Sequence, residues 1–314
     1  MPAVSVIVPA RDAAATLPRT LAALAAQVLD GGREVIVVDD RSRDATVRIA
    51  REAGLGPVIG SDAPGPAAAR NAGAAAAAGR ILAFTDADCF PTEGWLAAGV
   101  AALAGGADLV QGAVAPDPAA RPGPFDRTLW VDADRGLYQT ANLFVGRELF
   151  GRLGGFESWL GPVAAKELAE DVLLGWAARR AGAVVAFAPE AVVHHAVHPR
   201  GARGFVAERL RLRFFPALVA RIPELRRESC FAGVFLTRRS AAFDLALVGL
   251  AAAAAGRRAG PLAWGLPYLA LSVRDGVRWG PRLGPRVAVV GLAADAVGAG
   301  ALALGSLRTG SPLL

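Results

Sequence analysis

The chain is predicted to begin with an α/β domain built on a mainly parallel sheet and to end in an apolar helical region. The first observation behind this prediction is that short β-branched apolar runs alternate with helical patterns through the first two thirds of the sequence. The second is a series of apolar blocks beyond residue 240, separated by arginine-rich segments. We therefore expect an α/β domain at 1–237 and a hydrophobic, arginine-rich region at 238–314.

The first elements follow from local pattern. The run "VSVIVPA" (4–10) suits a strand buried on both faces, and Leu17, Leu21 and Leu24 recur at helical spacing. A second buried strand is predicted in 33–42, "REVIVVDDRS". The next elements are a helix in 44–54 that ends at Gly54, a short strand in 56–60, an alanine-rich helix in 65–79 and a strand in 80–88.

The second half of the domain continues the alternation. It is predicted to contain a helix (95–103), a strand (107–116), a loop (117–124), a strand, helix and glycine turn (140–158), an amphipathic helix (167–182), two short strands (183–199) and an amphipathic helix (203–227). Strands that alternate with helices favour a parallel sheet covered on both faces. Such sheets bind ligands beyond the carboxyl ends of their strands.

The C-terminal region contains three apolar blocks, and an arginine, glycine and proline loop at 274–286 precedes the last. Only the last is long enough for a comfortable spanning helix, which needs about 20 residues, and it carries Asp295. We expect either two or three short spans or re-entrant and interfacial helices. The alternative is an alanine-rich helical subdomain that packs on itself. The blocks are 240–256, 260–273 and 287–307.

Charge is distributed unevenly along the chain. The net charge of +6 comes from residues 238–314, where nine arginines face three acids, whereas the first 237 residues are balanced. Because this basic segment is strongly apolar, it argues against nucleic acid and for a membrane surface, with its arginines on the cytoplasmic side. The two cysteines allow no disulfide framework, and the N-terminus enters a strand pattern directly, so no signal peptide is expected.

Acidic residues cluster where predicted strands end. Asp39 and Asp40 follow one strand, and Asp86 and Asp88 follow another. Carboxylate oxygens are preferred ligands of hard divalent cations. Alternate residues of a strand face opposite ways, but a turn at the strand end would let Asp86 and Asp88 reach one metal ion. The alternative is that Asp88 caps a helix.

Five segments in order resemble the family 2 glycosyltransferases of GT-A fold: "VSVIVPARD", "EVIVVDDRSRDAT", "GPAAARNAGAAAAAGRILAFTDAD", "ANLFVGRELFGRLGGF" and "EDVLLGWAARRAG". The resemblance covers about residues 4–215. It implies a UDP- or GDP-linked nucleotide-diphospho-sugar donor, a Mn²⁺ or Mg²⁺ cofactor, and inverting transfer to a lipid, lipid-linked or polysaccharide acceptor at the cytoplasmic membrane face. A Gln-x-x-Arg-Trp motif is absent from the sequence, which favours single transfer over processive synthesis.

The resemblance also implies roles for the residues on the donor side. Pro9, Ala10 and Asp12 match the first nucleotide-binding loop, Asp39 matches the aspartate that contacts the base, and Arg70 matches an arginine near the base and phosphates. The alternative for Arg70 is that it simply starts a helix together with its neighbour Asn71. Beside these residues, Asp40 and Ser42 are expected to order the turn, and Asp44 is expected to cap the next helix.

Two acidic motifs match the metal and acceptor sides. Asp86 and Asp88 correspond to the metal and diphosphate motif, with Asp88 as the more direct ligand. Glu170 and Asp171 correspond to an acidic pair at the start of a helix, where Asp171 would be the general base. The alternative for this pair is favourable interaction with the helix N-terminus.

Three histidines lie close together in the sequence, and their roles stay open. His195 best fits a family histidine that could ligate the metal or contact the diphosphate; a hydrogen-bonded surface turn is the alternative. Zinc is disfavoured because no cysteine or carboxylate lies at suitable spacing. Arginines that could contact lipid phosphates or the leaving diphosphate are Arg203, Arg209, Arg211 and Arg213.

Two other functions compete with glycosyl transfer. A membrane scaffold that binds nucleotide sugars without catalysis would not need all of Asp39, Asp86, Asp88 and Asp171 intact. A sugar nucleotidyltransferase usually has a glycine-rich phosphate loop after its first strand, and "VPARDAAAT" lacks one.

Overall fold

The structure is a computed structural model that describes residues 2–163 and 166–314. The chain forms two compact units. The first comprises the residues up to Arg121 together with Thr128–His198, and the second comprises Pro122–Arg127 and Pro199–Leu314.

The first unit contains an eight-stranded mixed sheet of order β3-β2-β1-β4-β7-β6-β10-β5. Strands β7 and β5 run antiparallel to their neighbours, and the other pairings are parallel. This mixed, mainly parallel sheet confirms the predicted fold class. The strands are β1 (Val4–Ala10), β2 (Arg33–Asp39), β3 (Val58–Gly60), β4 (Ile81–Phe84), β5 (Cys89–Pro91), β6 (Leu109–Pro116), β7 (Leu143–Gly146) and β10 (Val185–His195), with a separate hairpin β8 (Leu160–Val163) and β9 (Lys166–Leu168).

Helices cover both faces of this sheet, as expected from the alternating pattern. Val6 and Val8 of β1 belong to a core cluster with residues of α1, α2 and α4. Ile7 points to the other face, where its side chain lies against Gly73 of α3. The helices of this unit are α1 (Leu17–Ala25), α2 (Thr46–Ala53), α3 (Pro66–Ala76), α4 (Trp95–Ala104), the 3₁₀ turn η1 (Thr140–Asn142), α5 (Arg147–Arg152) and α6 (Glu170–Arg180).

Two details of the sheet differ from the prediction. Residues 183–199 were expected to form two short strands, but β10 is one strand whose register shifts between Ala188 and Val192. The irregularity follows Pro189, which has no N–H to donate to a ladder. In addition, the short strand β5 follows the predicted strand and pairs antiparallel with β10 at the sheet edge. Cys89, the residue after Asp88, is therefore part of the sheet.

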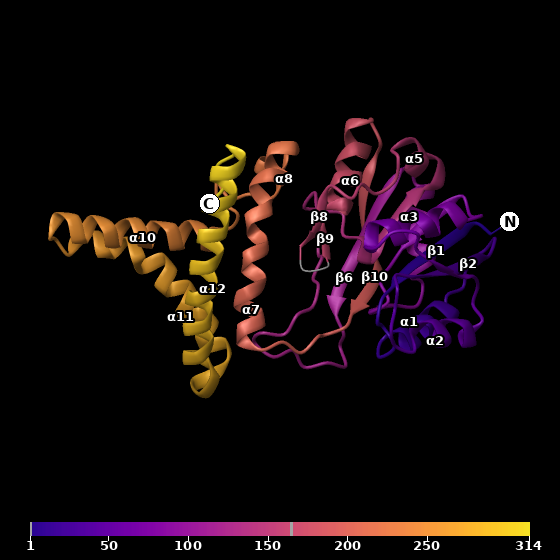
Figure 1. The fold of residues 1–314 in the computed structure, drawn as a ribbon, viewed down its shortest axis with the longest axis horizontal. Helices are drawn as coiled ribbons and strands as arrows, with labels where there is room; N and C mark the ends of the chain where they lie inside the picture. Colours follow the sequence, from indigo (N-terminus) through magenta and orange to yellow (C-terminus); the bar gives the residue numbers. More distant parts are fainter. Residues whose placement is uncertain (1, 164–165) are drawn as a thin grey trace. The chain divides into compact units, whose positions relative to one another are not determined.

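The second unit is helical (Figure 1). The predicted helix at 203–227 is divided into shorter segments, with Pro216 in the first turn of α8 and Pro223 just before α9. The predicted loop at 274–286 is mostly helical, because Pro281 occupies the first turn of α12, where proline is tolerated. The helices are α7 (Ala202–Glu208), η2 (Arg209–Phe214), α8 (Phe215–Arg221), α9 (Leu225–Glu228), α10 (Arg238–Gly256), η3 (Gly260–Gly265), α11 (Leu266–Arg278) and α12 (Gly280–Thr309).

Residues 199–237 group with the C-terminal helices, whereas composition placed the domain boundary at residue 237. The physical reason is close packing between α12 and the segment η2–α8, which lie side by side in Figure 1. A Cβ at Gly305 would lie 2.2 Å from the carbonyl oxygen of Arg213, and one at Gly298 would lie 3.2 Å from Leu212. Small residues on α12 therefore allow the backbone of the η2–α8 segment to pack closely against this helix.

Two helices of the second unit are long and apolar enough to cross a membrane. They are α10, which has 19 residues, and α12, which has 30; their most apolar 18-residue stretches have mean hydropathies of 1.3 and 2.0. Large apolar side chains on both are exposed, such as Leu250 and Val289. This combination weakly favours the membrane association expected from the sequence.

Candidate active site

The loops after β1 and β2 are joined by hydrogen bonds. The parallel register places Ala10 beside Asp39, so the two strands end together. The backbone N–H of Asp12 donates to Oγ of Ser42 at 3.0 Å, and a carboxylate oxygen of Asp12 accepts from the N–H of Arg43 at 2.7 Å. The backbone of Asp12 has a φ of +47°. The predicted nucleotide-binding residues thus lie at the ends of two adjacent strands, as do Pro9, Ala10 and Asp39, or in the connected loops that follow them, as does Asp12.

Asp40, Ser42 and Asp44 order these loops, as the sequence suggested. The buried carboxylate of Asp40 accepts the N–H of Gly65 at 3.1 Å, which fixes the approach to α3. The N–H of Ser42 donates to Asp39 at 3.1 Å. Asp44 accepts from the N–H of Thr46, the first residue of α2, at 2.9 Å. Asp44 therefore supports the start of α2, one residue before the N-cap position Ala45.

Arg70 connects two acidic motifs that are far apart in the sequence. Its side chain, only 5% exposed, donates to Asp86 at 2.8 Å and to Glu170 at 3.0 Å. Asp86 follows β4, whereas Glu170 begins α6. The structure therefore places Arg70 within a network of carboxylates, where its Nε is buried without a hydrogen-bond partner among the described residues.

The neighbouring residue Asn71 fixes the glycine turn at 154–156. Its side-chain amide donates to the carbonyl of Phe156 at 2.8 Å and accepts from the N–H of Phe156 at 2.9 Å. Two successive side chains of α3 thus contact segments much later in the chain. The sequence separation is 100 residues for the Arg70–Glu170 contact and 85 for the Asn71–Phe156 contact. These long-range contacts are not explained by the alternative in which Arg70 and Asn71 only start a helix.

Replacing Arg70 by methionine is expected to destabilise the first unit strongly. The change leaves Glu170 and Asp86 without their cation, and breaking a buried pair costs about 3–5 kcal/mol. The free energy of unfolding is measured by urea denaturation. The control is Arg48→Met, which breaks an exposed pair with Glu52 and should cost no more than about 0.5 kcal/mol. Equal losses in the two variants would contradict a structural role for the Arg70 network.

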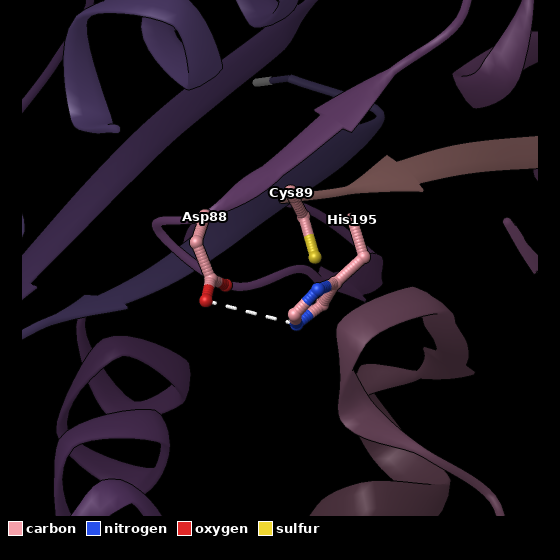
Figure 2. Close-up of side chains that lie close together, drawn as sticks. All are labelled: Asp88, Cys89 and His195. Carbon is pink, nitrogen blue, oxygen red and sulfur yellow. Dashed lines mark ion pairs between the residues drawn. The ribbon is translucent and has the colours of Figure 1, made fainter. Parts of the chain in front are cut away.

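Asp88, Cys89 and His195 form a second cluster (Figure 2). Antiparallel pairing of β5 with β10 sets Cys89 opposite His195, and Asp88 is the residue just before this strand. One potential ligand atom from each of the three side chains lies within 4.8 Å of the others. The carboxylate of Asp88 is 3.6 Å from Nε2 of His195. Figure 2 shows the three side chains converging from neighbouring backbone segments.

The histidine of this cluster is oriented for ligation through Nε2. Its Nδ1 lies 2.6 Å from the carbonyl oxygen of Ala196, to which an Nδ1–H would donate. A hydrogen bond of this kind leaves the lone pair on Nε2, which faces Asp88. His198 lies 2.7 Å from the same carboxylate. The donor set of carboxylate and imidazole fits a divalent cation such as Mn²⁺.

The structure corrects the argument from spacing that disfavoured zinc-type ligation. That argument found no cysteine or carboxylate at suitable spacing from the histidines, yet Cys89 and Asp88 both lie beside His195. The sequence separation conceals this because the contact arises from pairing of distant strands. Burial, together with the nearby Asp86 and Asp88 charges, raises the pKa of the Cys89 thiol well above its usual range. In the absence of a bound cation, the thiol of Cys89 is therefore neutral.

Asp171 occupies the second position of α6, beside Glu170. Burial, followed by repulsion from Glu170, raises the pKa of Asp171 to about 8, and Arg70 and the backbone N–H of Val172 oppose this increase. The N–H of Val172 donates to Asp171 at 2.8 Å. A carboxyl group with a pKa near neutrality is suited to accept a proton during catalysis.

Sequence reasoning missed Cys89 as a member of this cluster and left His198 without a role. The signal for Cys89 was the short run "DADCF", in which polar and apolar residues alternate and which could have been read as an edge strand. Without its partner strand, however, no local pattern shows that Cys89 meets His195. The other predicted residues divide into the connected β1 and β2 loops, the Arg70 network and the Asp88 cluster.

Comparisons with known proteins point to one family. Residues 5–149 match the family described as glycosyl transferase family 2. The chain is 32% identical over 219 residues to the glycosyltransferase AglE of Haloferax volcanii, a match that covers 64% of this chain and 69% of that protein. It is 39% identical over 110 residues to an uncharacterized glycosyltransferase of Mycobacterium bovis, covering 35% of this chain and 48% of that protein. The chain thus spans about half the length of this mycobacterial relative.

Solved structures show the same fold. The mannosyltransferase PcManGT from Pyrobaculum calidifontis, in complex with GDP-Man and Mn²⁺, superposes with a TM-score of 0.61 at 24% identity, covering 95% of this chain and 86% of that chain. S. aureus TarS in complex with UDP-GlcNAc gives a TM-score of 0.51 at 17% identity, covering 99% and 93%. From the matched motifs, the AglE relationship and this fold, the chain belongs to the family 2 glycosyltransferases.

Proposed function

We propose that the protein transfers a sugar from a UDP- or GDP-linked nucleotide-diphospho-sugar to a hydroxyl of a lipid, lipid-linked or glycan acceptor. The observation that carries this proposal is the Arg70 bridge. It joins Asp86, expected on the donor side, to Glu170, the neighbour of the expected base, within one buried network. Donor binding and acceptor activation would then share a site.

On the donor side, the loops after β1 and β2 would hold the nucleoside. Asp39 can accept the imide N–H of uracil or the N1–H of guanine, so it does not select between the two bases. Pro9, Ala10 and Asp12 would form the wall opposite Asp39. The ligands named for the two superposed structures, GDP-Man and UDP-GlcNAc, support testing both nucleotide classes.

Asp86, Asp88 and His195 would hold Mn²⁺ or Mg²⁺. When bound, the cation supplies positive charge to the diphosphate that leaves. Arg70 keeps Asp86 in place at 2.8 Å, and His198 holds Asp88 at 2.7 Å. These contacts orient the carboxylates before the donor arrives, which lowers the reorganisation needed on binding.

Asp171 would accept the proton of the acceptor hydroxyl as its oxygen attacks the anomeric carbon. The new bond joins that oxygen to the anomeric carbon, and the bond to the diphosphate oxygen breaks on the opposite face. The nucleoside diphosphate departs with the bonding electron pair, and the proton stays on Asp171. A single displacement of this kind inverts the configuration, so an α-linked donor gives a β-glycoside.

The second unit supports a place at the cytoplasmic face of a membrane. Helices α10 and α12 have the length and apolar composition of spanning helices. The arginines of residues 274–286 lie at the end of α11 and in the first turns of α12, and such residues are enriched on the cytoplasmic side. A lipid or lipid-linked acceptor would be available there.

The test uses the purified full chain in detergent with UDP-Glc, UDP-GlcNAc and GDP-Man, each with Mn²⁺, Mg²⁺ or a chelator. We expect one nucleotide class to raise the melting temperature only when a cation is present; at 100 times Kd the gain is about 2.7 kcal/mol. Release of nucleoside diphosphate should then require an added membrane-lipid or glycan acceptor. Binding without turnover for every acceptor would favour a scaffold, and synthesis of a sugar nucleotide from a sugar phosphate would favour a nucleotidyltransferase.

A further inference from the structure

The second unit contains two adjoining cavities of opposite character. One, of about 290 Å³, is polar and is lined by residues that include Arg209, Arg239, Arg278, Asp275 and Asp295. The other, of about 460 Å³, is apolar and lies between α11 and α12. Both are lined by Ser272 and Ala288, so the two cavities meet at these residues.

The polar cavity has an excess of positive charge. Arg239 pairs with both aspartates, with 2.7 Å contacts to Asp275 and to Asp295. Arg209 and Arg278 have no carboxylate at ion-pair distance within residues 2–163 and 166–314. Three arginines against two aspartates leave a net charge of +1 in the cavity wall. An anion would therefore be complementary to this wall, since arginine donates paired hydrogen bonds to phosphate oxygens.

The apolar cavity adds hydrocarbon surface next to the polar cavity. Its lining includes Leu269, Val273, Val277 and Pro285. Valines 273 and 277 are more than half exposed, so the cavity opens at the surface of the unit. Where the cavities meet, the hydroxyl of Ser272 is buried and interacts with the side chain of Tyr268. A ligand with a polar group at this junction would add a hydrogen bond to this hydroxyl.

We infer that the second unit binds a lipid phosphate, with the phosphate beside Arg209 and Arg278 and the hydrocarbon chain between α11 and α12. The indole of Trp279 lines the polar cavity at the turn between these helices, and tryptophan is enriched at the headgroup level of membranes. The inference rests on the membrane association in the proposed function but not on the identity of the donor. The lipid is either the sugar acceptor or a membrane phospholipid, since both carry the same phosphate and chain chemistry.

Native mass spectrometry of the full chain in detergent tests this site. The probes are dioleoyl phosphatidic acid, dioleoylglycerol with the same chains but no phosphate, inorganic phosphate and a polyprenyl phosphate. Phosphatidic acid is expected to bind at least about tenfold more tightly than dioleoylglycerol, because charged hydrogen bonds are lost without the phosphate. It should also bind more tightly than inorganic phosphate. Stronger binding of polyprenyl phosphate would support an acceptor, and stronger binding of phosphatidic acid would support a structural lipid.

The matched variants are Arg278→Gln, Arg209→Gln and the control Arg258→Gln. Arg278 is exposed, so its replacement should leave folding intact, whereas Arg258 is an exposed arginine of the same unit that lines neither cavity. Arg278→Gln and Arg209→Gln should each weaken phosphatidic acid binding by about tenfold, and the control should not. Equal binding of phosphatidic acid and dioleoylglycerol, displacement by inorganic phosphate alone, or an equal loss in Arg258→Gln would overturn the site.

Donor binding separates this inference from the proposed function. Arg278→Gln should retain the metal-dependent rise in melting temperature produced by the nucleotide sugar, because its side chain belongs to the second unit. Phosphate-selective lipid binding in a protein that never turns over a donor would count against the proposed function alone. Donor turnover in a protein that binds lipids without regard to phosphate would count against the lipid site alone.

Discussion

Replacing Asp171 by asparagine is expected to lower sugar transfer by about 10²–10⁴-fold, the usual contribution of a general base. Asparagine keeps the size of the side chain but cannot accept the proton of the acceptor hydroxyl. Release of nucleoside diphosphate is measured at saturating donor. The control is Asp30→Asn, an exposed carboxylate before β2, which should retain activity. Full activity in Asp171→Asn would remove this residue from the reaction.

The pH dependence of the same residue follows from its raised pKa. Because the base must be ionised, kcat/KM of the wild-type enzyme should rise about tenfold per pH unit below the pKa of about 8 and level off above it. Asp171→Asn should lack this limb. A wild-type profile that stays flat over roughly the two pH units below that pKa would argue that ionisation of Asp171 does not limit the rate.

Asp171→Asn should also stabilise the first unit near neutral pH. The folded-state pKa of about 8 lies above the unfolded value of 3.8, so the folded protein holds the proton more tightly. Stability from this group is therefore fully present in acid and is lost as the pH rises toward 8. The variant lacks that loss, so its melting temperature should exceed the wild-type value by a margin that grows as pH rises. Each kcal/mol corresponds to roughly 2–4 °C for a domain of this size.

Replacing Asp88 by alanine is expected to abolish metal-dependent transfer and to weaken Mn²⁺ binding by more than about 10²-fold. The reason is that changes to groups that only support metal ligands already cost about 10–100-fold in affinity, and Asp88 is expected to be a ligand itself. Binding is measured from the paramagnetic resonance of free Mn²⁺, and activity from nucleoside diphosphate release. His198→Gln, which removes a 2.7 Å contact to Asp88, should have the smaller effect of about 10–100-fold.

The control for Asp88 is Glu93→Ala. Glu93 is an exposed acid in the turn after β5, close in sequence to Asp88. Its removal tests whether general loss of negative charge near this strand changes metal binding. Wild-type Mn²⁺ affinity in Asp88→Ala, or an equal loss in Glu93→Ala, would show that the cation is held elsewhere.

Much of the first unit is predictable from sequence because its strands are buried and locally patterned. Residues 4–10 and 33–39 are short segments rich in valine and isoleucine, which leave little ambiguity with helix once Pro9 and the flanking loops are considered. The expected helix end at Gly54 is confirmed, since this residue has a φ of +64° that suits glycine. These features depend on interactions within a few residues.

The remaining features depend on contacts between distant segments. The Asp88 cluster requires pairing of β5 with β10, and the Arg70 bridge requires α3 and α6 to approach the same point. Neither contact can be predicted from the local periodicity of apolar residues in the sequence. The helical conformation of residues 274–286 was also missed, because proline and glycine favour loops unless tertiary packing supports a helix start. Here Gly276 and Gly284 allow α11 and α12 to touch.

The edge strand β5 has a consequence for how this protein can vary over evolution. Only three residues long, it fixes which way Cys89 and His195 face, because neighbouring residues of a strand point to opposite sides of a sheet. A single inserted or deleted residue here would turn the thiol and the imidazole away from each other. The stretch between Asp88 and Thr92 should therefore tolerate residue substitutions more readily than insertions or deletions.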